Sequence, residues 1–328
     1  MSEIWQITVK VWNGIRRWFD SHAETNLSSE QDSRAMDLIR TLPFLVLHAL
    51  VLTVFWVGWS WVAVGMAVLL YATRMFAITG FYHRYFSHKT FRTSRVMQFV
   101  FAVFGASAVQ RGPLWWASNH RTHHACSDQP TDVHSPVHHG FWWSHLGWVL
   151  SHQQGTTNLK KIRDFARFPE LRFLDRFDVL VPFVLAVSLF VFGEWLANMY
   201  PQLETNGLQM LVWGFVISTV ALYHGTFTIN SLSHLFGTRP YATSDNSRNN
   251  FLLALLTLGE GWHNNHHHYP SSTRQGFRWW ELDITYYLLR GFQWCGLIWD
   301  IRPVPRWALE QTSLNQAKKN RDSEKIAV

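Results

Sequence analysis

The chain alternates long apolar stretches with polar, charged ones. From Leu42 to Tyr82 the only charged residue is Arg74. A membrane-spanning helix needs about 20 apolar residues, so this stretch is long enough for two helices joined by a tight turn near Gly58. Further uncharged stretches cover residues 179–193 and 207–236, and the shorter of them needs its flanks to cross a bilayer. The pattern predicts an all-α membrane protein with four transmembrane helices in two hairpins.

The positions of Lys and Arg predict how these helices are oriented. Apart from Arg74, every Lys and Arg lies in residues 1–41, in residues 84–176 or beyond residue 238, and the two predicted hairpin turns carry none. Cytoplasmic loops collect Lys and Arg, so we expect both termini on the cytoplasmic side. A net charge of +7 then fits a face beside anionic lipid and requires no nucleic-acid partner. Core helices of a soluble protein would not require this partition.

The predicted topology divides the chain into six segments. The first has Trp and basic residues without the clean apolar stretch of a cleavable signal peptide, so we expect an amphipathic helix on the membrane surface. The segments are residues 1–40, an interfacial helix and linker; 41–82, the first transmembrane hairpin; 83–176, a cytoplasmic segment; 177–236, the second hairpin; 237–309, a second cytoplasmic segment; and 310–328, a polar tail.

Histidine spacing is the main chemical signal in the sequence. His120, His123 and His124 have i, i+3, i+4 spacing, which places three imidazoles on one face of a helix. The same spacing recurs downstream, and two smaller groups complete a set of nine: His83 and His88, His234, and His263, His266 and His267. Imidazole suits Fe, Zn, Cu and Ni. Nine exceed the four ligands of a structural zinc, so they predict a dimetal site in a cytoplasmic helical cap.

Two details of these groups carry expectations of their own. His83 and His88 are five residues apart, about 140° around an α-helix, so we expect His88 beyond a helix end. Asp128, Asp132 and Glu260 could accept from metal-bound imidazoles or equally cap turns. The remaining histidines fit no repeated spacing and are expected to be bystanders: His22, His48, His134, His138, His139, His145, His152, His224 and His268.

The cysteines add little to this picture. Two Cys cannot hold an iron–sulfur cluster, which needs about four thiolates. Cys126 follows the second histidine group closely, but a small buried residue is the simpler interpretation.

In their order and spacing, the groups resemble the integral-membrane fatty acyl desaturase family, in its stearoyl-CoA-type Δ9 branch. The resemblance covers about Leu42 to Trp299. The motifs that carry it are His83-x4-His88, His120-x2-His123-His124, Asn230-x3-His234 and Gly259-Glu260-Gly261-Trp262-His263-x2-His266-His267.

The resemblance implies a cofactor and a reaction. Nine histidines would hold two Fe ions, and Asn230 would contact one of them through water. O2 would be the co-substrate for removing two hydrogens from an unactivated fatty acyl chain, with a cis double bond as product. No side-chain acid or base beyond the metal ligands is expected to be catalytic.

The resemblance also suggests substrate-binding residues. Gln110, Trp116 and Thr226 match positions that shape the bend of the family's acyl tunnel. Tyr71 and Met75, one helical turn apart, could close its far end, and a bulky Met75 would then favour shorter chains. Ordinary packing is the alternative for each of the five.

The carrier of the acyl chain and the electron donor are less constrained. Acyl-CoA members carry charged residues where this chain has Ser118, Asn119, Ser151 and His152, so a phospholipid-linked chain stays open beside CoA. The sequence has neither a His-Pro-Gly-Gly haem motif nor a Gly-x-Gly-x-x-Gly fingerprint. We therefore expect a separate donor, a ferredoxin or a cytochrome b5-like protein with its reductase, docking on the basic face.

Two competing functions have different signatures. A membrane di-iron hydroxylase of alkanes, sterols or carotenoids would use the same oxidant, and the Asn230 and Trp262 motifs favour desaturation over it. A transporter or sensor that binds metal without catalysis would place its ligands inside the spans. Only His48 and His224 lie deep in the predicted spans.

Overall fold

The computed structural model describes residues 12–23, 35–152 and 157–310. Within these ranges the chain is mostly helical. The exception is a short antiparallel ribbon in which β1 (Arg92–Thr93) pairs with β2 (Ile298–Trp299). The predicted interfacial helix is seen as a helix over residues 12–19, while most of the linker and the polar tail lie outside the described residues.

In the described part of the chain, four helices are long and apolar enough to cross a membrane, as predicted. The first, Leu38–Val57, joins α2 (Leu38–Leu50), η1 (Val51–Thr53) and α3 (Val54–Val57). The second, Trp61–Ser87, joins α4 (Trp61–Phe76) and η2 (Ala77–Ser87). The third is α11 (Leu180–Met199). The fourth, Gly207–His234, joins α12 (Gly207–Gln209), η6 (Met210–Ile217), α13 (Ser218–Ser231) and η7 (Leu232–His234).

The breaks between the spans follow from local chemistry. Gly58 ends the first span with a φ of +67°, a conformation that glycine adopts without a steric penalty. Ser60 then caps α4 by accepting from the Ala63 N–H at 3.1 Å. Asn206 starts the fourth span with a capping box. The two connections touch, because the Thr205 hydroxyl donates to Ser60 Oγ at 2.7 Å.

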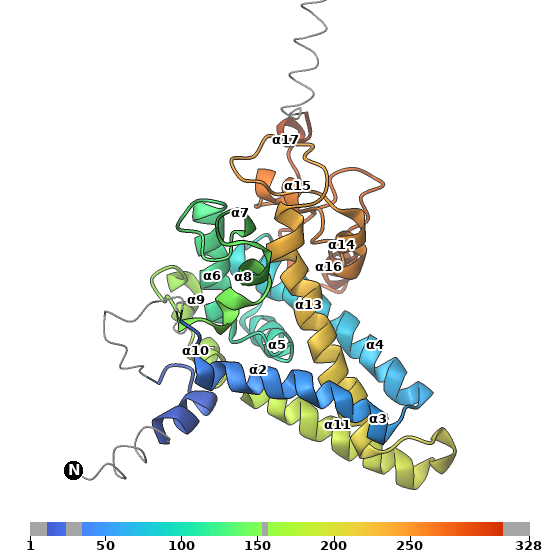
Figure 1. Ribbon diagram of the computed structural model, residues 1–328. Coiled ribbons are helices and arrows are strands. Elements are labelled where there is room, and N and C mark those ends of the chain that lie inside the picture. The colour runs from blue at the N-terminus through green and yellow to red at the C-terminus, as the bar shows by residue number, and fades with distance from the viewer. Residues whose placement is uncertain (1–11, 24–34, 153–156, 311–328) are drawn as a thin grey trace, which may run out of the picture.

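The long helices converge at one end of the molecule. Figure 1 shows α4 and α13 running from the end that holds α3 to the end that holds α15. Two further helices, α5 (Arg95–Ala106) and α6 (Pro113–Cys126), pack against η2 there. A turn at Ser107–Gly112 separates them. Phe81 of η2 stacks on Phe101 of α5 at 3.9 Å between ring centroids.

Shorter elements complete this end of the molecule. Before the third span these are α7 (Pro136–His139), α8 (Phe141–His145), η3 (Gly147–Leu150), α9 (Arg163–Ala166) and α10 (Pro169–Arg176). After the fourth span these are α14 (Phe251–Leu256), α15 (His263–His268), α16 (Ile284–Trp294) and α17 (Arg306–Glu310).

A buried ion-pair network joins the second span to the segment around α15. Arg84 of η2, almost fully buried, bonds Glu260 at 3.0 Å and Asp283 at 2.9 Å. The same guanidinium donates to the Thr273 carbonyl at 2.8 Å. A buried charge is tolerated only when it is paired and hydrogen-bonded. Arg84 therefore fixes where the third histidine group lies relative to the helix that carries the first.

Candidate metal centre

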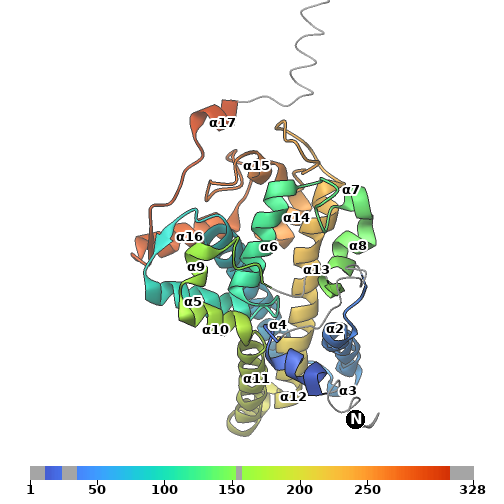
Figure 2. The ribbon, with the colours of Figure 1, turned by 90° about the vertical axis from the view of Figure 1, so that its left-hand side faces the viewer.

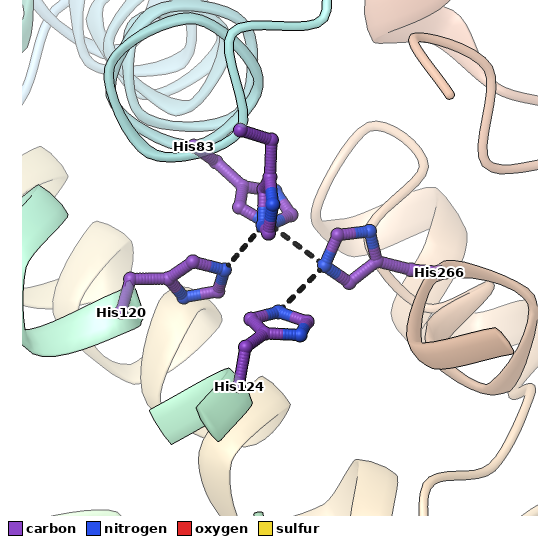
Figure 3. Close-up of side chains that lie close together, drawn as sticks. His83, His120, His124 and His266 are labelled. Atoms are coloured by element: carbon purple, nitrogen blue, oxygen red, sulfur yellow. Dashed lines mark hydrogen bonds between the residues drawn. The ribbon is translucent and has the colours of Figure 1, made fainter. Parts of the chain in front are cut away.

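The nine predicted histidines come together in two convergent groups. In each group, one ring nitrogen from every histidine lies within 4.8 Å of those of the other members. The five-His group contains His83, His88, His120, His124 and His266, and the four-His group contains His123, His234, His263 and His267. Figure 3 shows rings of the five-His group pointing toward a common centre from separate segments of the chain.

Each histidine triplet is divided between the two groups. α6 gives its i, i+4 pair, His120 and His124, to the five-His group and His123 to the other. α15 does the reverse, since His263 and His267 join the four-His group and His266 the five-His group. The spacing within a triplet therefore does not assign it to one group, a question that the sequence leaves open. Helices that supply both groups must lie between them, and Figure 2 shows α6 running toward α15 beside α13.

The unusual backbone of η2 places His83 and His88 together. η2 is a π-helix, and the N–H of His88 bonds the carbonyl of His83 at 3.2 Å, an i→i+5 bond. The wider turn brings residues five apart almost into line, and the two ring centroids are 4.9 Å apart. The separation of about 140° expected for an α-helix does not apply here. His88 itself caps the end of η2, which agrees with its predicted place beyond the helix.

Carboxylates fix the tautomer of four of the imidazoles. Glu260 lies 2.5 Å from His83 Nδ1, Asp132 lies 3.0 Å from His123 Nδ1, Asp128 lies 2.9 Å from His234 Nδ1, and Asp245 lies 2.6 Å from His267 Nδ1. A carboxylate can only accept, so Nδ1 donates and Nε2 carries the lone pair. The three acidic residues that the sequence left undecided therefore contact ligand-type histidines.

The geometry of the lone pairs fits metal ions. His83 Nε2 lies 3.1 Å from His266 Nε2, and His234 Nε2 lies 3.0 Å from His263 Nε2. Two ligands at right angles around an ion, each about 2.1 Å from it, would be about 3.0 Å apart. His267 Nε2 is buried and has no hydrogen-bond partner in the described part of the chain. A cation would satisfy these lone pairs, which otherwise carry a desolvation cost.

The pKa shifts agree with neutral, ligand-type rings. Burial lowers the pKa of His88, His120 and His124 well below the ordinary value. Burial likewise lowers the pKa of His123 to about 3. For Asp132 burial alone would raise the pKa, but attraction and hydrogen bonds from His123 lower it below its usual range. The rings stay unprotonated and the carboxylate stays charged, as a metal site requires.

Sequence reasoning missed two residues beside this centre. Asp245 lies in the connection after the fourth span, and its spacing from the histidine groups gives no signal. His134, expected to be a bystander, shares Asp132 with His123, and its Nδ1 lies 2.9 Å from the carboxylate. An Asp followed at i+2 by His in a loop was the only local signal for this second contact.

Other histidines bond away from the two groups. His48 Nε2 lies 3.3 Å from His224 Nε2, and His224 Nδ1 lies 3.1 Å from His145 Nε2. His138, His139 and His268 bond backbone carbonyls, and His22 and His152 lie beside Asp175 and Asp37.

A cavity of about 510 Å³ extends from the two groups into the helices. Its wall includes His83 and His120 of the five-His group and His123 and His263 of the four-His group. The volume lies in the range of small-molecule sites. Both histidine groups therefore face one cavity.

Four of the five predicted substrate residues line this cavity: Gln110, Trp116, Thr226 and Met75. Gln110 Nε2 donates to Thr226 Oγ1 at 2.9 Å, and Trp116 stacks on His120 with ring centroids 5.1 Å apart. The Tyr71 hydroxyl instead donates to the Leu256 carbonyl at 2.8 Å, outside the cavity wall. Asn230 also lines the cavity.

Two of the four positions where acyl-CoA members carry charged residues, Ser118 and Ser151, form hydrogen bonds within the protein. The Ser118 hydroxyl donates to the Trp115 carbonyl at 3.0 Å, and the Ser151 hydroxyl donates to the Trp148 carbonyl at 2.8 Å. Both serines are buried, so neither offers a group to a carrier at the surface.

Four helices that could span a membrane and nine buried or half-buried histidines in two groups are the features of a membrane protein with a candidate dimetal site. The family model described as fatty acid desaturase matches residues 59–293, and the chain belongs to that family. The family is a family of oxidoreductases that use a di-iron centre and act on fatty acyl chains.

The relatives differ in what their names say they act on. The chain is 37% identical to a palmitoyl-monogalactosyldiacylglycerol delta-7 desaturase of Arabidopsis thaliana, over 86% of this chain and 73% of the relative. It is 36% identical to an sn-1 stearoyl-lipid 9-desaturase of Anabaena variabilis, over 80% of this chain and 93% of that relative. It is 35% identical to an icosanoyl-CoA 5-desaturase of Limnanthes douglasii, over 84% and 74%.

Proposed function

We propose that the protein introduces a cis double bond at Δ9 of a saturated fatty acyl chain for unsaturated fatty acid biosynthesis. One O2, two electrons and two protons are consumed with two hydrogens of the chain, and two waters are released. The relatives support desaturation, and their names cover positions 5, 7 and 9 on lipid-linked and CoA-linked chains. Position 9 and the carrier are the finer part of the proposal: the resemblance favours CoA, and a phospholipid-linked chain stays open beside it.

The observation that carries this proposal is the shared wall of the cavity. His83, His120, His123 and His263 contribute to it beside apolar side chains such as Ile78 and Phe227. An extended acyl chain in the cavity would have methylenes beside both histidine groups. Holding a reactive carbon at fixed geometry supplies much of the rate in such a reaction.

In this proposal the two histidine groups would hold two Fe ions, and Asn230 would contact one of them through water. The bound irons would supply the oxidising power needed to break an unactivated C–H bond. The chain's residues would hold the ions, exclude water and orient the substrate. The hydrogen bond from Gln110 to Thr226 would fix the bend of the acyl chain, and Met75 would limit its length.

The proposed arrangement in the membrane follows the charge distribution. The spans form two hairpins, and the histidine-rich end and both termini face the cytoplasm, where Lys and Arg collect. Residues 83–176 and 237–309 then form the cytoplasmic cap. The electrons come from a separate ferredoxin or cytochrome b5-like protein and its reductase.

The test is a fatty acid profile of a host that expresses the chain and supplies a ferredoxin or cytochrome reductase system. We expect new cis-9 monoenes by gas chromatography–mass spectrometry, with the double bond located by derivatisation. His123→Ala should abolish them, whereas His268→Ala, at a half-buried ring that bonds the Ala308 carbonyl, should not. Hydroxylated products would instead identify the protein as a hydroxylase. No product from a metal-loaded, electron-supplied protein would refute the proposal.

A further inference from the structure

The cavity has a cationic region far in sequence from the histidine groups. Its wall there comes from the helix over residues 12–19, from the start of α2 and from the residues before α11. Arg17, Arg40 and Arg111 lie in this region beside Trp18 and Asp178. A cavity that serves only an alkyl chain would have no use for three guanidinium groups, because burying a charge carries a desolvation cost.

The charges in this region are only partly matched by the protein. Arg17 forms an ion pair with Asp37, which also lies 3.8 Å from Arg40, and Arg111 pairs with Asp178 at 2.9 Å. Among the described residues, Arg17 and Arg40 thus share one carboxylate, that of Asp37. The Nε atoms of Arg17 and Arg40 are buried and have no hydrogen-bond partner within residues 12–23, 35–152 and 157–310. Guanidinium donors of this kind match phosphate oxygens in geometry and charge.

The helix over residues 12–19 is fixed in place over this region. Trp18 Nε1 donates to the Ile39 carbonyl at 2.6 Å, and the Ser21 N–H bonds the Arg176 carbonyl at 2.8 Å. Figure 1 shows this helix, in dark blue, beside the start of α2 and near α10. Arg17 is therefore held at the cavity by contacts to two other helices, and its side chain is only 10% exposed.

The same part of the cavity is walled by two candidate membrane spans. Pro43, Phe44 and Leu47 of α2 line it, together with Pro182 of α11. Both spans pack chiefly on η6, and Figure 2 shows α2 and α11 apart from each other. Only 6% of the first span is buried inside the protein. The cavity therefore reaches between two helices whose outer faces suit lipid.

Depth in the bilayer distinguishes a lipid from a soluble carrier. Arg40 is two residues into the first candidate span, Leu38–Val57, so in the proposed membrane arrangement its guanidinium would lie at the level of the headgroups. Trp18 beside it has the side chain typical of that level. A phosphate held there would belong to a lipid whose acyl chain is already in the membrane.

We propose that Arg17 and Arg40 form a headgroup site for a phosphate-bearing membrane lipid, whose acyl chain enters the cavity sideways between α2 and α11. The inference rests on the proposed function and names its substrate class, a phospholipid-linked acyl chain in place of the CoA thioester. Arg17 and Arg40 are positioning and specificity residues in this scheme, since they hold the lipid far from the carbons that react.

The activity experiment compares carriers directly. The iron-loaded protein is placed in nanodiscs of distearoyl phosphatidylglycerol, in nanodiscs of distearoyl monogalactosyldiacylglycerol, which has no phosphate, or in the latter with added stearoyl-CoA. We expect desaturation to be at least about tenfold faster from the phospholipid than from the other two. Faster desaturation of stearoyl-CoA or of the galactolipid would overturn the headgroup site.

Variants separate the guanidinium groups from general effects on the fold. Arg17→Gln with Arg40→Gln should raise the KM for the phospholipid about tenfold or more while kcat changes little. The matched control is Arg95→Gln, which removes an exposed arginine paired with Glu170. Arg40→Gln alone is the milder test, because it leaves the Arg17–Asp37 pair intact. A fall in kcat without a change in KM would contradict the proposed role.

A binding experiment keeps this inference separate from the proposed reaction. Native mass spectrometry of the metal-free protein, released from mixed phosphatidylglycerol and galactolipid micelles, should show retained phosphatidylglycerol that the double variant loses. This result would support the headgroup site even if the chain did not desaturate. Equal retention of both lipids by the unaltered protein would refute the site even if desaturation were established.

Discussion

Replacing Glu260 by Gln should weaken one of the two metal groups and spare the other. Glu260 bonds His83 Nδ1 at 2.5 Å through one oxygen and Arg84 at 3.0 Å through the other. Glutamine keeps the shape but loses the charge that fixes the tautomer of His83 and raises its basicity. His83 belongs to the five-His group, so the effect should begin there.

The expected magnitude follows from what remains after the substitution. Loss of an outer partner of a metal-bound histidine costs about 10–100-fold in metal affinity, or about 1.4–2.7 kcal/mol. Arg84 keeps Asp283 at 2.9 Å and the Thr273 carbonyl at 2.8 Å, so its charge is not left unpaired. We therefore expect a loss of about 2 kcal/mol in the free energy of unfolding, smaller than for a fully broken buried pair.

The assay is iron retention after dialysis against a graded chelator, read by elemental analysis and Mössbauer spectroscopy on 57Fe-loaded protein. The unaltered protein should keep two irons at chelator concentrations where Glu260→Gln keeps about one. Asp128→Asn is the matched variant, because Asp128 lies 2.9 Å from His234 Nδ1 in the four-His group. It should remove the other iron, so that different Mössbauer components disappear in the two variants.

Two results would refute this reasoning. If both variants lost the same Mössbauer component, the assignment of carboxylates to separate groups would be wrong. If Glu260→Gln released both irons together while its thermal unfolding stayed unchanged, the two groups would not be independent sites.

Three further substitutions test the cavity and its packing. Met75→Ala should shift product chain length upward in gas chromatography of the fatty acids, and an unchanged preference for shorter chains would exclude Met75 as the end of the cavity. Gly105→Ala should lower the free energy of unfolding by about 1–3 kcal/mol, measured by thermal unfolding, since a Cβ there would lie 1.9 Å from the Tyr82 ring. Thr226→Val leaves Gln110 without its acceptor at 2.9 Å, so we expect slower turnover and a scattered double-bond position by mass spectrometry.

The span pattern and the histidine set were readable from the sequence because both are local signals. A long uncharged stretch broken at Gly58 and Ser60 specifies two helices wherever it is placed, and the structure has its turn there. The four candidate spans overlap the three apolar stretches for the same reason, and two of them share residues 42–82. Apolar length and turn chemistry need no tertiary information.

The division of the histidines was not readable, because it depends on contacts between distant segments. The i, i+3, i+4 spacing places His120, His123 and His124 near one another on α6, but it does not say which group lies on which side of the helix. The π-helical turn that aligns His83 with His88 likewise needs more than local propensity to specify it. Asp245 could be found only once the chain after the fourth span had been placed against His267.

The way the ligands are distributed explains how the fold can hold two ions in fixed relation. The spans supply only His83 and His234, while α6 and α15 each supply residues to both groups. Moving either short helix would therefore disturb both groups at once. The carboxylates, in contrast, act on single ligands of one group. Each of them orients one ring of the nine histidines: Glu260, Asp128, Asp132 and Asp245. Shared helices fix the distance between the two groups, and separate carboxylates set the tautomers of four of their rings.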